Sequence, residues 1–140
     1  MRYFLFATLL AVNFLAPTQS RAFDAMSKFN DDATEMVGLL LEAEQLRQYL
    51  PEFSDASPLK LVNETMFLVD PEGLVVEAEV VAPGSIDAGT AIVIQDIDYK
   101  EPRATLHFRY APEGLRGSAD FQFDEKTSRW TLNSIEVFET

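Results

Sequence analysis

The sequence has no cysteine and only one histidine, His107, among its 140 residues. Without cysteine the chain forms no disulfide framework, carries no lipobox cysteine for a lipid anchor, and has no thiol nucleophile. Zinc sites built on several cysteine or histidine ligands are excluded for the same reason. We therefore expect a fold that needs no covalent cross-links, and we expect no cofactor.

Basic residues are also scarce. The chain has 11 lysines and arginines against 23 aspartates and glutamates, which gives a formal net charge of −12. Such a charge repels nucleic acids and anionic membranes, so both are poor partners. A basic protein surface, a cation or a neutral ligand fits the charge better. A solvated acidic surface that keeps an exported protein soluble explains the composition without any partner.

Residues 1–22 have the pattern of a secretory signal peptide. A positive start is followed by the mostly apolar run 3–16, and the small residues Ser20 and Ala22 precede the expected cleavage point. The run is shorter than the roughly 20 residues of a membrane span, so a retained anchor is the weaker interpretation. Cleavage leaves one domain, residues 23–140, with 9 basic and 23 acidic residues and a net charge of −14. The signal peptide predicts a periplasmic or secreted protein. Because small exported animal and plant domains commonly rely on disulfides, the lack of cysteine favours the bacterial periplasm or cell exterior.

Apolar residues recur at helical spacing between Asp24 and Leu50, and Pro51 marks the expected end of the helix. The apolar face is wide enough to pack across a sheet. Such a stripe indicates a core-facing helix rather than a surface for a membrane or a partner. Its members are Met26, Phe29, Ala33, Met36, Val37, Leu39, Leu40, Ala43, Leu46 and Leu50.

Two strands are expected on either side of the turn Asp70–Gly73. Asp, Pro and Gly at the first, second and fourth positions are typical of a type I turn, which predicts an antiparallel hairpin. The hairpin would put Phe67 opposite Val76. It would also put Glu64 opposite Glu79, where like charges destabilise a sheet.

The stretch from Thr90 to Glu139 alternates apolar and polar residues in four runs separated by turns, which predicts an antiparallel meander. The register about those turns sets apolar against apolar side chains and acid against base. A slip of one residue would send every side chain to the wrong face. The predicted pairs are Arg103 with Asp124, His107 with Asp120, Leu106 with Phe121, Ala104 with Phe123, Phe123 with Trp130, and Phe121 with Leu132.

The predicted fold is of the α+β class, with one N-terminal helix packed on a curved, roughly six-stranded antiparallel meander sheet. The order of elements, which closes with Arg129-Trp-Thr-Leu132 and then Ile135 and Val137, resembles that of cystatin-like and NTF2-like folds. The resemblance implies a helix laid over a curved antiparallel sheet. No catalytic residue of either family maps onto this chain.

The first candidate site is the group His107, Asp120 and Asn133, which the predicted register places side by side on three strands. A carboxylate beside an imidazole fixes its tautomer and stabilises its protonated form, so His107 could act as a general base with Asp120. Asn133 would then orient a carbonyl group or a water molecule. Ordinary polar pairs on a solvated sheet face are the alternative explanation.

The second candidate is the carboxylate group of Glu64, Glu77 and Glu79. Opposed like charges call for a different register, for side chains that splay apart in water, or for a cation such as Ca²⁺, which oxygen ligands suit. A solvated acidic face explains the group as well, so we assign no metal site.

The third candidate is a pocket for an apolar ligand between helix and sheet, because a bent sheet under one helix can enclose a cavity. A filled core is the alternative. The residues concerned are Phe67, Phe108, Tyr110, Phe121, Phe123 and Trp130.

These patterns favour an exported, non-enzymatic binding or interaction module for a protein partner or a small apolar ligand. One alternative is a small acid–base enzyme that uses His107 and Asp120. Another is an envelope assembly subunit that self-associates through an exposed edge strand such as 59–69.

Overall fold

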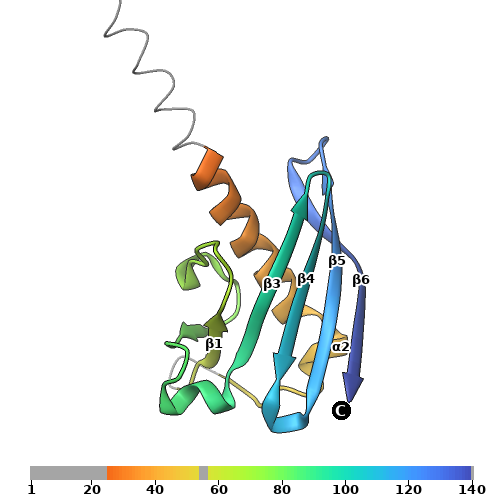
Figure 1. Cartoon of the computed structure of the whole chain (residues 1–140). Helices are drawn as coiled ribbons and strands as arrows, with labels where there is room; N and C mark the ends of the chain where they lie inside the picture. The colour runs from red at the N-terminus through yellow and green to blue at the C-terminus, as the bar shows by residue number, and fades with distance from the viewer. Residues whose placement is uncertain (1–24, 54–56, 140) are drawn as a thin grey trace, which may run out of the picture.

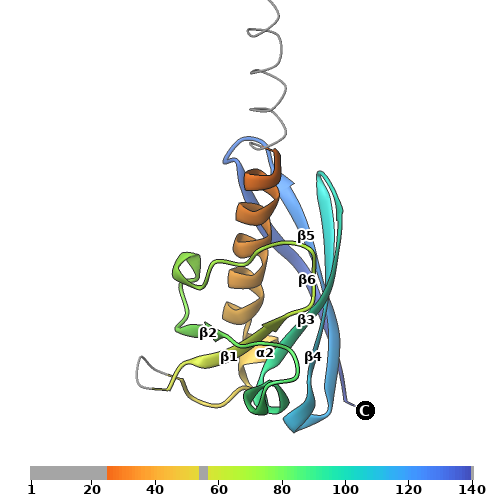
Figure 2. The same cartoon turned by 60° about the vertical axis from the view of Figure 1, so that its left-hand side comes forward.

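Figure 1 shows the chain as a computed structural model, which describes residues 25–53 and 57–139. A long helix, residues 25–42, lies across one face of a sheet (Figure 2). The signal peptide predicted for residues 1–22 lies outside the described residues. The other elements are α2 (Glu44–Arg47), β1 (Leu59–Asn63), η1 (Pro71–Gly73), β2 (Ala78–Val80), η2 (Ile86–Thr90), β3 (Ile92–Lys100), β4 (Arg103–Tyr110), η3 (Ala111–Glu113), β5 (Leu115–Asp124) and β6 (Arg129–Glu139), where η marks a 3₁₀ helix.

The six strands form one open sheet in the order β2-β1-β3-β4-β5-β6. Strands β3 to β6 are antiparallel neighbours, whereas β1 runs parallel to both β2 and β3. The α+β class, with one long helix on a six-stranded sheet, is confirmed, but the sheet is mixed and not a pure meander. The edges are β2 and β6, so the predicted edge strand 59–69 is wrong.

The predicted hairpin around Asp70 does not form, because the chain after β1 leaves the sheet and follows the helix. The backbone N–H of Leu68 donates to Asn30 Oδ1 at 2.9 Å, and that of Asp70 donates to Thr34 Oγ1 at 3.0 Å. Asp70 does begin a turn, the short helix η1, in which its carboxylate accepts from the N–H of Glu72. The helix thus supplies hydrogen-bond partners that the hairpin would have supplied.

The predicted register is right for the end of β5 with the start of β6, up to the bulge beyond Phe121 and Leu132, and wrong by two residues for β4 with β5. The pairs Phe121 with Leu132 and Phe123 with Trp130 are confirmed. On its other side, however, Phe121 lies opposite Ala104. A shift of two residues keeps every side chain on its face, so the alternation of the sequence does not reveal it. The wrong pairs are Arg103 with Asp124, Ala104 with Phe123, Leu106 with Phe121, and His107 with Asp120.

Gly117 explains the register that β4 and β5 adopt. It lies opposite Phe108, and a Cβ atom at this position would come within 2.5 Å of the Phe108 ring and would also meet the backbone oxygen of Glu136. The ring covers the glycine, as aromatic side chains often do in sheets. The turn after β4 ends at Gly114, whose φ of 61° suits glycine, and it sets the last residue of β4 opposite the first of β5.

A β-bulge at Gln95 reverses the alternation of β3. Before the bulge Ile92 and Ile94 pack into the core beneath the helix, and after it Ile97 and Tyr99 do so. An unbroken alternation would have turned Tyr99 to the outer face. The bulge therefore brings Tyr99 to the helix.

The helix buries its apolar stripe over most of its length. Met36, Val37 and Leu40 are completely buried, and each side chain of this size contributes about 1.5–3 kcal/mol on burial. Met26 and Phe29 are 66% and 37% exposed, so the predicted core role is wrong for the first described turns. No helix in the described part of the chain is long and apolar enough to cross a membrane.

Candidate functional site

The first described turns of the helix, the loop after β1 and the end of β3 surround an apolar hollow of about 330 Å³. Met26 and Met66 at its rim are 66% and 90% exposed, and the neighbouring Leu68 is 71% exposed. We call these three side chains, with Phe29, the apolar patch. Large apolar side chains gathered on one surface are typical of interaction sites. The hollow is lined by Met26, Phe29, Asn30, Met66, Phe67 and Tyr99.

Three aromatic rings form one side of the hollow. The ring of Phe29 lies edge-on to that of Tyr99, with centroids 5.1 Å apart, and edge-on to that of Phe67 at 6.4 Å. The rings of Phe67 and Tyr99 are 6.3 Å apart. Aromatic pairs at such distances are favourable by about 0.5–1.5 kcal/mol beyond their buried area, so the three rings hold one another in place.

The loop that carries Met66 and Leu68 of the apolar patch is held by Asn63 at the end of β1. Asn63 Nδ2 donates to the carbonyl oxygen of Phe67 at 2.6 Å, and Asn63 Oδ1 accepts from the N–H and the hydroxyl of Thr65 at 3.0 and 2.6 Å. Leu68 is tied to Asn30 on the helix, as described above. The loop backbone is thus fixed before any partner binds, which lowers the entropy cost of binding.

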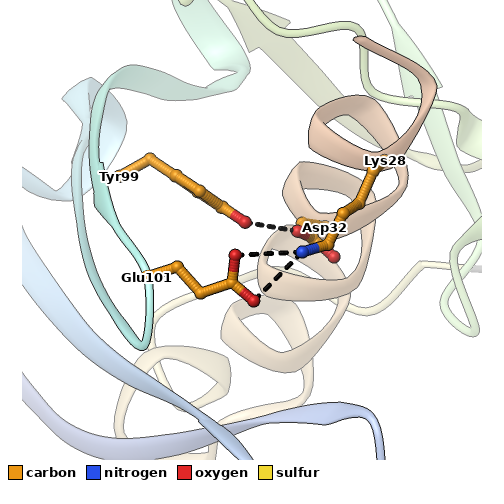
Figure 3. Close-up of polar contacts among 4 residues, drawn as sticks. All are labelled: Lys28, Asp32, Tyr99 and Glu101. Atoms are coloured by element: carbon orange, nitrogen blue, oxygen red, sulfur yellow. Dashed lines mark hydrogen bonds and ion pairs between the residues drawn. The ribbon is translucent and has the colours of Figure 1, made fainter. Parts of the chain in front are cut away.

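Two polar contacts beside the hollow join the helix to the end of β3 and to the turn that follows it (Figure 3). The Tyr99 hydroxyl donates to Asp32 Oδ2 at 2.7 Å, and Lys28 Nζ lies 2.9 Å from Glu101 Oε2. Burial raises the pKa of Tyr99 above its usual value, and the hydrogen bond to Asp32 and the charge of Asp32 raise it further. Tyr99 therefore stays protonated at neutral pH and acts as a donor rather than as a base.

A second hollow of about 320 Å³ lies between the long helix, the segment around η1 and the start of β6, and we call it the acidic groove. Arg129 Nε and the N–H of Trp130 both donate to Glu35 Oε1, at 3.0 and 2.9 Å, so this carboxylate is neutralised. The other carboxylates give the groove its negative charge. Its lining is Asp31, Thr34, Glu35, Gly38, Leu39, Glu42, Asp70, Gly73, Val75 and Arg129.

The structure separates His107 from Asp120. His107 lies opposite Ser118 on β5 and opposite Asp96 on β3, because of the two-residue shift in register. All of these side chains belong to the outer face of the sheet, away from the helix. The predicted pairing of His107 with Asp120 is therefore wrong.

The bulge in the pairing of β5 with β6 sets Asp120 opposite Ser134, so the predicted pairing of Asp120 with Asn133 is wrong as well. Asp120 and Asn133 are hydrogen-bonded to other residues. Asp120 accepts hydrogen bonds from the hydroxyls of Thr105 and Ser134, at 2.8 and 3.1 Å. Asn133 Nδ2 donates to Gln122 Oε1 at 3.1 Å. These are cross-strand polar pairs, which the alternative explanation of a solvated sheet face accounts for.

All six aromatic residues predicted to line a pocket pack into or against the hydrophobic core. For five of them, this fits the alternative of a filled core. Phe67 also packs against the core, but it lines the apolar hollow as well. The five are Phe108, Tyr110, Phe121, Phe123 and Trp130.

The predicted opposition of Glu64 and Glu79 is also wrong. Glu64 Oε1 lies 3.3 Å from Arg109 Nη2, and Glu79 is paired with Lys60 in the ladder of β1 and β2. The like-charge contact that suggested a cation is therefore absent. Within residues 25–53 and 57–139, no three His, Cys, Asp or Glu side chains, Glu77 included, are grouped so as to hold a metal ion.

One feature of the sequence indicates the apolar patch, although it is not part of a periodic pattern. Met66, Phe67 and Leu68 form an unbroken apolar run, and a strand with one buried face can bury only alternate members of such a run. At least one of them has to be exposed. Met26 and Phe29 give no such indication, because they continue the apolar stripe of the helix and so would be expected in the core.

Comparison with known proteins assigns the chain to no family. No protein-family model matches it, and no curated protein and no solved structure is significantly similar to it. The cystatin-like or NTF2-like outline therefore stays a prediction. The function has to be inferred from the surface of the molecule itself.

Proposed function

We propose that the protein is an exported, non-enzymatic interaction module that binds a protein partner through the apolar patch. The main support is that two highly exposed apolar side chains lie on a loop whose backbone is held by hydrogen bonds. Met66 and Leu68 are 90% and 71% exposed on a loop that Asn63 and Asn30 hold by hydrogen bonds. A partner that covers these side chains gains hydrophobic burial without first having to order the loop.

A protein partner suits the hollow better than an enclosed small ligand. Ligand pockets usually measure about 300–1,000 Å³ and enclose most of the ligand. The hollow, at about 330 Å³, lies at the lower end of that range, and Met26 and Met66 project from its rim. Methionine is common on protein-binding surfaces because its flexible, polarizable side chain adapts to different partners.

The acid–base alternative has less support. Asp120 and Asn133 are bonded to neighbours other than His107.

Export is supported by the pattern of residues 1–22, and it predicts that the protein recovered from the periplasm or the medium begins at Phe23. N-terminal sequencing tests this, and an intact N-terminus would contradict it.

The variant Met66→Asp tests the interaction function, with Ile86→Asp as its matched control. Ile86 is 99% exposed in η2 and is not part of the patch, so both variants remove one exposed apolar side chain and add one negative charge. Tagged wild type and both variants are used to capture proteins from an extract of the source, and the captured proteins are quantified by mass spectrometry. Calorimetry then measures the Kd of the purified partner.

We expect wild type and Ile86→Asp to retain the same partner, and Met66→Asp to bind it at least tenfold more weakly, because burying a charge in an apolar contact is costly. Equal binding by all three proteins would refute the proposal. If His107→Gln instead abolished the function while Met66→Asp preserved it, the acid–base alternative would replace the interaction module.

A further inference from the structure

We infer that the second half of β6 docks an extended segment of another protein, which joins the sheet as an additional strand and alternates apolar with basic side chains. This inference goes beyond the proposed function, because it concerns a surface that shares no residue with the apolar patch. It follows from the outward backbone groups of β6, from its half-buried apolar side chains, and from its charge.

β6 is the longer of the two edges of the sheet. It has 11 residues, whereas β2 at the other edge has 3. Natural sheets usually protect a long edge with lysine, proline, a bulge or a covering element. β6 contains no lysine or proline, and its bulge at Asn133 precedes the second half. In Figure 1 this half lies at the border of the sheet, with no other described segment beyond it.

The ladder shows which backbone groups of β6 point away from the sheet. In an antiparallel strand, successive residues turn their N–H and C=O groups to opposite sides. The N–H of Phe123 donates to the carbonyl oxygen of Pro102 on the β4 side, so the alternation along β5 turns Ser118 toward β6, where it pairs with Glu136. The residues of β6 that alternate with Glu136 therefore turn their N–H and C=O groups outward. They are Ile135, Val137 and Glu139.

The two halves of β6 differ in what occupies this outer side. In the first half, the N–H of Trp130 donates to Glu35 Oε1 at 2.9 Å, so the helix already takes that position. In the second half, no backbone hydrogen bond joins Ile135 or Val137 to any segment of residues 25–53 or 57–139 outside the sheet. An added strand supplies backbone partners to such groups, which is the mode of binding called β-augmentation.

The side chains of this edge favour an alternating segment. Ile135 and Val137 pack against the core on the helix side of the sheet but are only half-buried, so apolar side chains of an added strand would cover them. Glu136 and Phe138 lie on the opposite face, and Phe138 is 55% exposed. A basic side chain opposite Glu136 stabilises the pairing, whereas an acidic one destabilises it.

Charge favours a strand of another protein over a second copy of this chain. Two copies with a net charge of −12 each repel one another, whereas a basic segment is attracted. Pairing of this edge with itself about Glu136 would also set two Glu136 side chains opposite each other.

Backbone N-methylation tests the edge, because it blocks the N–H groups on one side of a strand only. The test peptide alternates valine with lysine. When its valines lie beside Ile135 and Val137, the N–H groups of the valines face β6 and those of the lysines point away. One probe is methylated on the backbone nitrogens of its lysines and the other on those of its valines, so both have the same composition and charge.

NMR titration of the isotope-labelled protein measures the Kd of each probe and identifies the amide signals that change. We expect the lysine-methylated probe to shift the signals of Ile135, Val137 and Glu139 and to bind at least tenfold more tightly than the valine-methylated probe. Equal Kd values for the two probes, or no shift of these signals at millimolar peptide, would overturn the inference.

Val137→Pro and Val80→Pro are a matched pair of variants, one at each edge. On β2 the N–H of Val81 donates to Leu61 on β1, so that of Val80 points away. Proline is tolerated at such positions because no ladder hydrogen bond is lost. We expect Val137→Pro to bind the lysine-methylated probe at least tenfold more weakly than wild type, and Val80→Pro to stay within threefold. Equal loss in both folded variants, as judged by thermal melts, would contradict docking at β6.

Two further measurements identify the occupant and the surface. Sedimentation of wild type should show a monomer, and a dimer that Val137→Pro dissociates would make a second copy the occupant and overturn the inference. Met66→Asp should bind the lysine-methylated probe as wild type does. If Met66→Asp lost the probe while Val137→Pro kept it, the peptide would lie on the apolar patch and the inference would fail. The proposed function is judged by the captured partner, so either proposal can fail without the other.

Discussion

Asp32 is only 8% exposed, and its carboxylate accepts a hydrogen bond from the hydroxyl of Tyr99 at 2.7 Å. A buried carboxylate that loses a donor keeps the cost of its lost hydration, which exceeds the net contribution of the bond when it is made. At the scale of single residues, this hydrogen bond therefore contributes more to the stability of the fold than the neighbouring ion pair of Lys28 with Glu101, because that pair is exposed and solvent screens it.

Replacing Tyr99 by Phe removes this donor. We expect the free energy of unfolding at pH 7 to fall by about 1–3 kcal/mol, as measured by urea denaturation. Tyr49→Phe is the matched control, since Tyr49 is also half-buried, and it should cost less than about 0.5 kcal/mol. An equal fall in the free energy of unfolding of the two variants would show that the hydrogen bond to Asp32 does not contribute to stability beyond what any half-buried tyrosine hydroxyl contributes.

The same variant has a pH dependence whose sign follows from the raised pKa of Tyr99. The usual pKa of tyrosine is 10.0, and burial with Asp32 nearby holds the folded-state pKa above it. As pH rises past 10, the unfolded chain releases this proton first, so it binds fewer protons than the folded chain and stability falls. The difference between wild type and Tyr99→Phe should be fully present below pH 10 and should shrink above it.

At the scale of strands, Gly117 sets how β4 and β5 pack. We expect Gly117→Ala to destabilise the protein by about 1–3 kcal/mol, because the added methyl group would overlap the ring of Phe108 and the backbone at Glu136. Gly89→Ala is the control, since a Cβ atom there meets nothing within 4 Å. Urea denaturation of both variants measures the effect. Equal stability of the two would show that the sheet accommodates the methyl group.

This glycine also shows how far sequence reasoning can reach. The helix and the strands from Ile92 onward are predictable because each has one buried and one exposed face, which leaves a period in the sequence. A shift of two residues leaves the same period, so only the need of Phe108 for a small neighbour across the strand distinguishes the two registers. Gly117 satisfies that need, whereas the predicted register sets Ala119 opposite Phe108.

The apolar hollow was less predictable than the sheet, because it depends on contacts between distant segments. The bulge at Gln95 brings Tyr99 to the helix, and the bond from Leu68 to Asn30 pulls the loop out of the sheet. Neither contact leaves a period in the sequence. An apolar side chain such as Met26 looks like a core residue until the loop beside it has been placed.

At the scale of the whole molecule, we expect repulsion between like charges to outweigh the ion pairs. The ion pairs of Lys28, Lys60, Arg109 and Arg129 are partly or largely exposed, which limits each to about 0–1 kcal/mol. The chain as a whole carries a net charge of −12. Self-repulsion of that charge opposes the compact state, and salt screens it.

Raising NaCl from about 10 mM to about 300 mM should therefore raise the Tm by a few degrees, because the Debye length falls from roughly 30 Å to below 8 Å. Scanning fluorimetry checks this, and the triple variant Asp96→Asn/Asp98→Asn/Glu136→Gln, which carries three fewer negative charges, should show a smaller rise. A Tm that falls with salt would mean that the ion pairs, and not the excess of carboxylates, dominate the electrostatics of the fold.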